Sequence, residues 1–300
     1  MSVYPINPFT QPGRWFKGCL HVHSTASDGR LAPDEVLAWY RQRGYHFVAL
    51  TDHDVWTQGR TFSDGFITLS GIEIEGMDPQ RGLFHLVGLG LRRPPDLHGA
   101  GASMQTAINR LREADGRVVI AHPYWSGQRS ADLLDLSGCF GLEVFNGGCE
   151  VDDAKGFSAV HWDDLLAAGR RLWGVASDDA HWRRGDHDAG LGWVWVRAAA
   201  LTAPAILEAL EQGRFYASGG PEIRDFRLDG GRVYARCSPV TTVDFIGDGH
   251  RSRRLTAPPG ETMTEAGIPL KKGQRYVRLA CRDEAGRWAW SNPIFLDSSA

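Results

Sequence analysis

Nine side chains that can bind metal ions occur where apolar runs of the sequence give way to polar residues. Each offers an imidazole nitrogen or a carboxylate oxygen. They are His21, His23, Asp28, His53, Glu73, His85, His122, Asp179 and His181. Donors of these two kinds suit Zn²⁺, Mn²⁺ or Fe²⁺ without separating them. Nine ligands exceed what one ion needs, so they predict two or three divalent ions with one carboxylate bridging between them.

No motif in this set is specific alone. With eleven histidines in the chain, a His-x-His pair is expected by chance about 0.4 times. His85 could equally be a hydrogen-bonded core histidine, and Asp179 with His181 a pair on a surface loop. Glu73 is harder to explain in that way, because a carboxylate within the apolar run FITLSGIEIE is costly to bury unless it is paired or metal-bound. The joint occurrence of the nine at successive strand ends favours a metal centre.

Short apolar, β-branched runs alternate with helical patterns through the first two thirds of the chain. Strands are predicted at 15–23, 46–53, 66–75, 83–91, 117–123, 141–146, 171–181 and 190–196. Helices are predicted at 33–44, 103–115, 130–136, 157–169 and 202–213. A turn around Asp78, Pro79 and Gly82 separates the third and fourth strands. This alternation is typical of a parallel sheet covered on both faces, and with this many units we expect it to close into a barrel whose mouth gathers the nine ligands.

The pattern changes near residue 220, after which β-rich runs alternate with Gly, Pro and Asp turns and no amphipathic helix intervenes. We therefore predict two domains, an α/β barrel over residues 1–219 and a small antiparallel β-sandwich over residues 220–300. The sandwich could bind carbohydrate, shape the substrate mouth or form a dimer interface, and we favour a structural role. Trp288 and Trp290 could equally belong to its core.

The overall composition limits the class of protein. Hydrophobic residues make up 42% of the chain, and 33 basic against 36 acidic side chains leave a formal net charge of −3. Because no excess of cations can neutralise phosphates, the balance argues against general affinity for nucleic acid or anionic membranes. Five widely spaced cysteines without a Cys-x-x-Cys pair suggest neither a disulfide framework nor a thiolate zinc site. No signal-peptide pattern and no membrane-spanning segment is apparent, so we expect a cytoplasmic protein and leave self-association open.

In their order along the chain, the candidate ligands form a set of motifs that resembles the PHP (polymerase and histidinol phosphatase) family, relatives of the amidohydrolases. The motifs are HVH at 21–23, SDG at 27–29, TDH at 51–53, Glu73, His85, HP at 122–123 and SDDAH at 177–181. The resemblance spans about residues 15–216 and implies a distorted (β/α)7 TIM-like barrel. The opening PGRWFKGCLHVH and the tail WAWSNPIF are similar to a subgroup that includes carbaryl-hydrolase-like metallohydrolases.

The resemblance also distributes the ligands among the ions. It implies a first ion held by His21, His23, Glu73 and Asp179, a second by Glu73, His85 and His122, and a third by Asp28, His53 and His181. One departure is the doubled Asp178-Asp179. The spacing to His181 favours Asp179 as the ligand and leaves Asp178 as a supporting or proton-transfer group.

The ligand set favours a hydrolase in which a hydroxide bridging two ions attacks a phosphorus or carbonyl centre. We predict a phosphoesterase acting on a small-molecule phosphomonoester or phosphodiester, with Asp178 or a ligand histidine such as His181 protonating the leaving group. A carboxylester, carbamate or amide hydrolase is the alternative enzyme, since the same hydroxide can attack a carbonyl. A non-catalytic binding or accessory module is the alternative outside enzymes, and the complete ligand set argues against it.

Aromatic, amide and cationic residues next to the ligands suggest substrate contacts. The candidates are Trp56, Trp125, Asn146, Arg183 and Arg184. The tryptophans could stack on a base or an aromatic leaving group, and the arginines could bind phosphate. Each residue also has a structural interpretation, as rim packing, a solvated charged loop or, for Asn146, the cap of the following turn. Likewise, Asp52 could orient His53 or form a turn.

Overall fold

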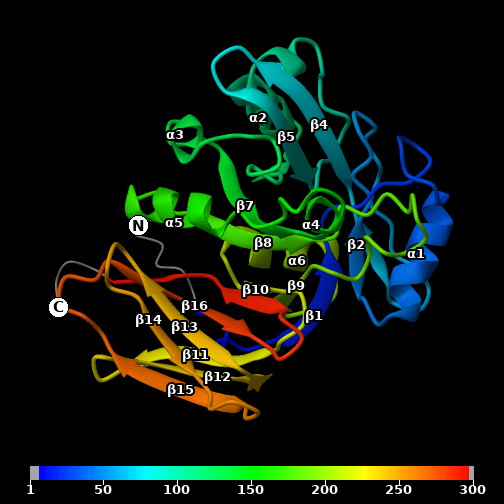
Figure 1. Cartoon of the computed structure of the whole chain (residues 1–300). Coiled ribbons are helices and arrows are strands. Elements are labelled where there is room, and N and C mark those ends of the chain that lie inside the picture. The colour runs from blue at the N-terminus through cyan, green and yellow to red at the C-terminus, as the bar shows by residue number, and fades with distance from the viewer. Residues whose placement is uncertain (1–6, 297–300) are drawn as a thin grey trace.

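The protein, seen in a computed structural model that describes residues 7–296, is a mixed α/β chain (Figure 1). Its helices are α1 (Pro33–Gln42), α2 (Met104–Glu113), α3 (Ser130–Leu133), α4 (Gly147–Asp153), α5 (Ala159–Ala167) and α6 (Ala203–Glu211), with a 3₁₀ turn η1 at Ala100–Ala102. Its strands are β1 (Arg14–Cys19), β2 (Phe47–Ala49), β3 (Ile67–Leu69), β4 (Gly71–Asp78), β5 (Gly82–Leu89), β6 (Arg117–Ile120), β7 (Cys139–Asn146), β8 (Trp173–Ser177), β9 (Trp193–Ala198), β10 (Phe215–Ser218), β11 (Ile223–Asp229), β12 (Arg232–Val240), β13 (Thr242–Gly247), β14 (Arg253–Thr256), β15 (Met263–Pro269), β16 (Tyr276–Arg282), β17 (Trp288–Ser291) and β18 (Ile294–Phe295). The two predicted domains also include residues 1–6 and 297–300, which lie outside the described residues.

The strands of the described residues form three sheets. A ten-stranded sheet runs β14-β13-β16-β17-β10-β9-β1-β2-β3 with β18 beside β16, a five-stranded sheet runs β4-β5-β6-β7-β8, and β11, β12 and β15 form the third. The predicted closed barrel is not seen in residues 7–296, because the ladders of the two larger sheets do not join. Single bridges link the two sheets instead: Val22 pairs with Ala180, beyond the ends of β1 and β8, and His53 pairs with Glu73 of β4. These bridges bring candidate ligands from both sheets next to one another.

The prediction of an all-parallel sheet is wrong in part. Strands β1, β2 and β3 are parallel, as are β6, β7 and β8, but β4 runs antiparallel to β5, and β9 antiparallel to β1. The physical reason is the length of the connections. Only residues 79–81 separate β4 from β5, which suffices for a hairpin but not for the crossover that parallel strands require.

The five predicted helices are present, and the structure adds one more. Pro33 begins α1, and Ser103 caps α2 by accepting a hydrogen bond from the Thr106 amide. The sequence missed α4, because Gly147 and Gly148 at its start are poor helix formers.

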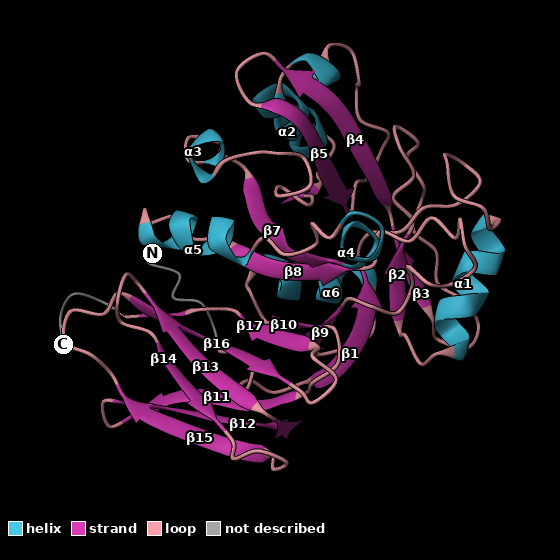
Figure 2. Ribbon diagram, in the orientation of Figure 1, coloured by secondary structure: helices cyan, strands magenta, loops and turns pink. Residues whose placement is uncertain are grey.

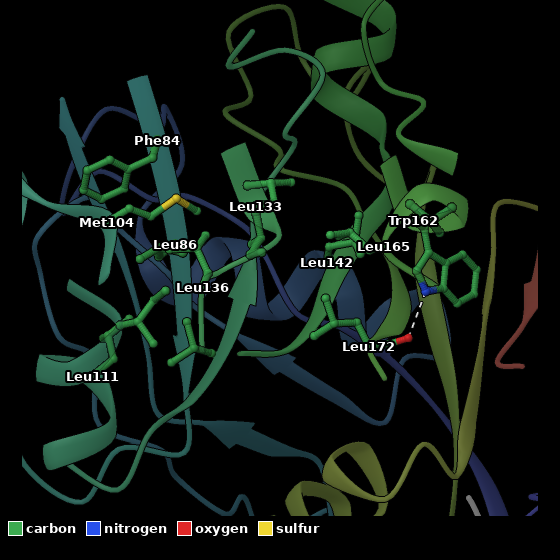
Figure 3. Packing of buried hydrophobic residues seen from close by; sticks show 14 of the residues in the cluster. Phe84, Leu86, Met104, Leu111, Leu133, Leu136, Leu142, Trp162, Leu165 and Leu172 are labelled. Carbon is green, nitrogen blue, oxygen red and sulfur yellow. Dashed lines mark hydrogen bonds between the residues drawn. The ribbon is translucent and has the colours of Figure 1, made fainter. Parts of the chain in front are cut away.

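A large apolar cluster packs α2, α3 and α5 onto the five-stranded sheet (Figure 3). Met104 of α2 lies beside Phe84 of β5, Leu111 of the same helix lies farther along the sheet, and all three are fully buried. In the same cluster, Trp162 of α5 donates its indole N–H to the Leu172 carbonyl oxygen at 2.8 Å. Because buried side chains at native density have little room to shift, this packing fixes the strand ends that carry the ligands.

The C-terminal region consists of strands alone, whereas the helices lie on the preceding part of the chain (Figure 2). Pairs among β11–β18 are antiparallel, as predicted. However, β17 also pairs with β10, so one sheet continues across the predicted boundary at residue 219. Trp290 of β17 is buried and stacks on Phe145 of β7 at 5.7 Å, so it belongs to the core. Within residues 7–296, no helix combines the length and the apolar character needed to cross a membrane.

Candidate metal centre

The structure brings the nine predicted ligands together around one cavity of about 360 Å³. Seven of them line the cavity, and His21 and His23 lie fully buried at its base, within bonding contact of Glu73 and Asp179. The seven are Asp28, His53, Glu73, His85, His122, Asp179 and His181. Residues up to 160 positions apart in the sequence therefore lie around one cavity.

Four of these side chains form a compact group of donor atoms. His21 Nε2 and His23 Nε2 lie 3.2 Å apart, and each lies 3.1–3.2 Å from Glu73 Oε2 and from Asp179 Oδ1. An ion bound tetrahedrally at about 2.0–2.1 Å holds its ligand atoms about 3.3 Å apart, so the spacing fits a divalent cation. The two carboxylate oxygens are buried and accept no hydrogen bond from the described residues. Such oxygens are costly to bury unless a cation neutralises them, and the group therefore fits a metal.

Hydrogen bonds on the outer side orient the imidazoles. Glu143 Oε1 binds His21 Nδ1 at 2.9 Å, and the other oxygen of Glu143 accepts from the His122 amide at 2.9 Å. His181 Nδ1 donates to the Asp179 carbonyl oxygen at 2.8 Å. These bonds leave Nε2 of His21 and His181 free to act as ligands, which is the usual arrangement around protein-bound metals. Glu143, which no sequence motif contains, therefore supports both His21 and His122.

A second group of donors surrounds the other oxygen of Glu73. Oε1 lies 2.9 Å from His85 Nδ1 and 3.4 Å from His122 Nε2. His53 Nδ1 lies 3.3 Å from Oε2 of the same carboxylate, so His53 lies between this group and a third group, which surrounds Asp28. The carboxylate of Glu73 thus reaches two ligand groups, as a bridging residue would.

The third group surrounds Asp28. Its Oδ1 atom lies 3.3 Å from His181 Nε2, 3.7 Å from His23 Nδ1 and 3.9 Å from His53 Nε2. Arg183 donates to the other oxygen of Asp28. Asp28 is 42% exposed, so this group lies at the open side of the cavity.

Opposite charges dominate the electrostatics of the buried group. Burial alone would lower the pKa of His23, but its close contacts with the Asp179 and Glu73 carboxylates and their negative charges outweigh it and raise the pKa to about 9. The pKa of His21 is also raised, because Asp179, Glu73 and Glu143 outweigh its burial. Burial would raise the pKa of Glu73 and of Asp179, yet the neighbouring histidines hold both well below the usual range. Ionised carboxylates at this depth create a strong local attraction for cations.

Asp178 does not have the position expected of a proton donor. It is fully buried, does not line the cavity, and accepts hydrogen bonds from Tyr40 Oη at 2.6 Å and from three consecutive amides at 2.7–2.8 Å. Those amides belong to residues 190–192. The carboxylate therefore ties the end of β8 to the loop before β9 and supports its neighbour, Asp179.

The predicted substrate contacts divide between the cavity and other places. Trp125 and Arg183 line the cavity. Trp56 lines a different cavity, away from the ligands, and Arg184 is largely exposed and pairs with Asp152 at 3.4 Å. Asn146 is fully buried, caps α4 by accepting from the Cys149 amide, and donates to Glu143 and Asp179. Asn146 is thus a positioning residue, because no substrate atom can reach its amide.

Two further outcomes concern residues beside the ligands. Asp52 accepts hydrogen bonds from the amide and hydroxyl of Ser24 and from the hydroxyl of Ser27, so its side chain stabilises the turn that follows β1. Among the described residues it makes no hydrogen bond to His53. Cys149 lines the cavity and was not predicted as a ligand, because no recognised motif contains it.

Comparisons with known proteins agree with the motifs. No protein-family model matches the chain. Over 78 residues the chain is 40% identical to a phosphoribosyl 1,2-cyclic phosphate 1,2-diphosphodiesterase of Eggerthella lenta. This alignment covers 24% of this chain and 30% of that protein. Over 126 residues the chain is 30% identical to a 3',5'-nucleoside bisphosphate phosphatase of Chromobacterium violaceum, which covers 40% of each. The chain thus spans less than half the length of these curated relatives.

The fold has a counterpart among solved structures. A two-domain protein of Bacteroides vulgatus containing a predicted PHP-like metal-dependent phosphoesterase aligns with a TM-score of 0.52 at 16% identity, over 90% of this chain and 91% of that one. At this level of identity the alignment shows a shared fold. Together, these comparisons confirm the resemblance that the ordered motifs predicted.

Proposed function

We propose, from the premise that this chain is of the PHP type, that it is a metal-dependent phosphoesterase acting on small-molecule phosphate esters. The observation that carries the proposal is the group formed by His21, His23, Glu73 and Asp179, where two imidazole nitrogens and two unpaired carboxylate oxygens converge at the spacing of a metal's ligands. The names of the two curated relatives, a phosphodiesterase and a phosphatase, support phosphate esters as the substrate class.

Bound divalent ions would supply an activated water and would neutralise charge on the phosphate. The residues of the chain do the remaining work. Arg183, at the cavity wall, can bind a phosphate oxygen through its guanidinium. His181, whose Nδ1 is held by the Asp179 carbonyl oxygen, would deliver a proton to the leaving group from Nε2 if only two ions bind and that atom carries no ion. Trp125 offers an apolar wall, fixed by a 2.7 Å hydrogen bond from its indole N–H to Asp153.

The rim of the cavity makes substrate binding depend on the metal. Glu75, Asp152 and Asp153 line it in addition to the acidic ligands, whereas Arg183 is its one lysine or arginine among the described residues. A free phosphate ester would therefore meet a negative field, and only bound cations can reverse it. This charge distribution predicts that substrate affinity, and not turnover alone, is lost when the metal is removed.

The test is a parallel assay of p-nitrophenyl phosphate, bis-p-nitrophenyl phosphate and naphthyl esters, with Mn²⁺ or Zn²⁺ added and with chelator. We expect hydrolysis of at least one phosphate ester that chelator abolishes and metal restores. Hydrolysis of the carboxylesters alone would instead identify the alternative, an enzyme that attacks carbonyl centres. No hydrolysis together with no metal uptake would identify a binding module.

Finer features belong to the same proposal. We assign two or three divalent ions from among Zn²⁺, Mn²⁺ and Fe²⁺, a distorted barrel formed by the two larger sheets and their linking bridges, and a division into barrel and β-sandwich domains near residue 219. A cytoplasmic location is supported by the five cysteines, which form no disulfide.

A further inference from the structure

A thiol lies among the nitrogen and oxygen donors. Cys149 lines the cavity and is 6% exposed. Its sulfur lies 3.9 Å from Asp179 Oδ2, and the ligand atoms of Cys149, Asp179 and His122 all lie within 4.8 Å of one another. His122 Nε2 itself lies 3.7 Å from Asp179 Oδ2. The sulfur thus belongs to a cluster of three potential ligands.

The sequence places the sulfur there through a pair of glycines. Gly148 donates its amide to the Asp178 carbonyl oxygen at 2.7 Å, and a Cβ on Gly148 would meet the Asp179 carbonyl oxygen at 2.8 Å. A Cβ on Gly147 would likewise meet the Leu191 side chain at 2.8 Å. Because neither glycine carries a side chain, the start of α4 can approach the end of β8 closely enough to set Cys149 against Asp179.

The two oxygens of the Asp179 carboxylate face different groups of potential ligands, and the sulfur lies in one of them. Its Oδ1 atom faces the two imidazoles at the base of the cavity, His21 and His23, whereas Oδ2 faces His122 and Cys149. One carboxylate can therefore bridge the ion at the base to a second ion. For that second ion, Zn–S of about 2.3 Å and Zn–O of about 2.1 Å in tetrahedral geometry separate sulfur and oxygen by about 3.6 Å, which is close to the observed distance.

We propose that Cys149 Sγ is a tenth ligand, which binds the same ion as His122 and Asp179 and makes this centre prefer zinc over manganese. The inference rests on the proposed metal-dependent function. The S–H bond breaks as the S–metal bond forms, and the proton leaves to the buffer. Thiolate is a soft donor that favours Zn²⁺ over Mn²⁺, whereas the nine imidazole and carboxylate ligands alone do not separate these ions.

The test uses the full-length protein loaded with Co²⁺, because a thiolate bound to Co²⁺ gives a near-ultraviolet charge-transfer band that nitrogen and oxygen ligands lack. We expect this band in the wild type, its loss in Cys149→Ser, and its retention in Cys139→Ser. Cys139 is a suitable control, since it begins β7 and packs against the large apolar cluster outside the cavity. Metal content is measured for each variant alongside the spectrum.

The outcomes separate this inference from the proposed function. Stoichiometric Co²⁺ uptake by the wild type without the band would overturn sulfur ligation and leave the metal centre intact, as would a band that survives Cys149→Ser. Absence of Co²⁺ uptake by the wild type would overturn both. X-ray absorption at the zinc edge of the wild-type zinc protein requires no variant: a sulfur shell at about 2.3 Å is expected, and its absence would contradict the inference.

Discussion

Glu73 divides its two carboxylate oxygens between neighbouring groups of ligands. Oε2 lies 3.1 Å from Nε2 of both His21 and His23, whereas Oε1 lies 2.9 Å from His85 Nδ1. Replacing it with glutamine keeps the shape but removes the charge that two bound ions would share in the proposed site. We expect Glu73→Gln to weaken metal binding by more than about 100-fold and to abolish hydrolysis, as measured by metal analysis after desalting and by the phosphate-ester assay.

Glu113→Gln is the control for this substitution, since Glu113 lies at the exposed end of α2 and pairs only with Arg110 among the described side chains. It should retain metal and activity at wild-type levels. A Glu73→Gln protein that keeps its full complement of ions would contradict the bridging position of this carboxylate.

Metal binding should release protons at neutral pH. The pKa of His23 in the metal-free protein is about 9, above the ordinary 6.5, so its imidazole is protonated at pH 7 and must lose a proton to bind an ion. By linkage, proton binding stabilises the metal-free fold fully below about pH 6.5, and this contribution is lost as the pH rises through about 9. Calorimetric titration with Zn²⁺ in two buffers of different ionisation enthalpy should show proton release at pH 7. Equal apparent enthalpies in the two buffers would be inconsistent with a protonated His23.

The sequence could predict which side chains gather at the cavity but not the residues that support them. The nine ligands stand in recognisable motifs, and strand ends converge in folds of this kind. Cys149 and Glu143 stand in no such motif, because their positions depend on how closely α4 and β7 approach the cavity. Trp56 and Asn146 were assigned to substrate because they follow strands, but their side chains turn into another cavity and into the core.

Among the helices and strands, the length of each connection determined whether neighbouring strands pair parallel or antiparallel. The alternation of strands and helices in the sequence does not by itself show this direction. The alternation of strands and helices predicted the parallel pairs, in which helices such as α1 and α5 provide the crossovers. The turn from Asp78 to Gly82 is visible in the sequence. The antiparallel pairing of β4 and β5, which carry Glu73 and His85, was nevertheless not predicted. The predicted strand 66–75 in fact divides at Ser70 into β3 and β4, which belong to different sheets. A continuous apolar run cannot show such a division.

The contact between α4 and β8 should be intolerant of any side chain. A Cβ at residue 148 would meet the Asp179 carbonyl oxygen at 2.8 Å, and backbone cannot yield as a flexible side chain does. We expect Gly148→Ala to lower the free energy of unfolding by about 1–3 kcal/mol and to weaken metal binding, because Asp179 must shift. Urea denaturation and metal analysis would measure both effects.

Gly101→Ala is the matched control, since a Cβ there would meet its nearest neighbour, the Glu75 carbonyl oxygen, at an ordinary 3.4 Å. It should change stability by less than about 0.5 kcal/mol. If Gly148→Ala behaved like this control, the close approach of α4 would not be a requirement of the site.

At the level of the whole molecule, an ion pair between a buried arginine and a partly exposed aspartate joins the C-terminal strands to the rest of the chain. Arg278 of β16 is 1% exposed and donates to both oxygens of Asp163 in α5, at 2.7 and 2.6 Å. Asp163→Ala would leave the guanidinium buried without its partner, and we expect it to cost about 2–3 kcal/mol of unfolding free energy, measured by urea denaturation.

The exposed pair of Arg236 and Glu265, 3.4 Å apart, is the comparison. Glu265→Ala should cost less than about 0.5 kcal/mol, because solvent screens both charges. Equal effects of the two substitutions would argue against a structural joint at Arg278.

Anomalous diffraction from crystals of the zinc-loaded protein would show whether metal binds at Glu73. We expect a strong zinc peak enclosed by His21 Nε2, His23 Nε2, Glu73 and Asp179, with at least one further peak around the cavity. A fully loaded crystal with no zinc within bonding distance of Glu73 would contradict this expectation.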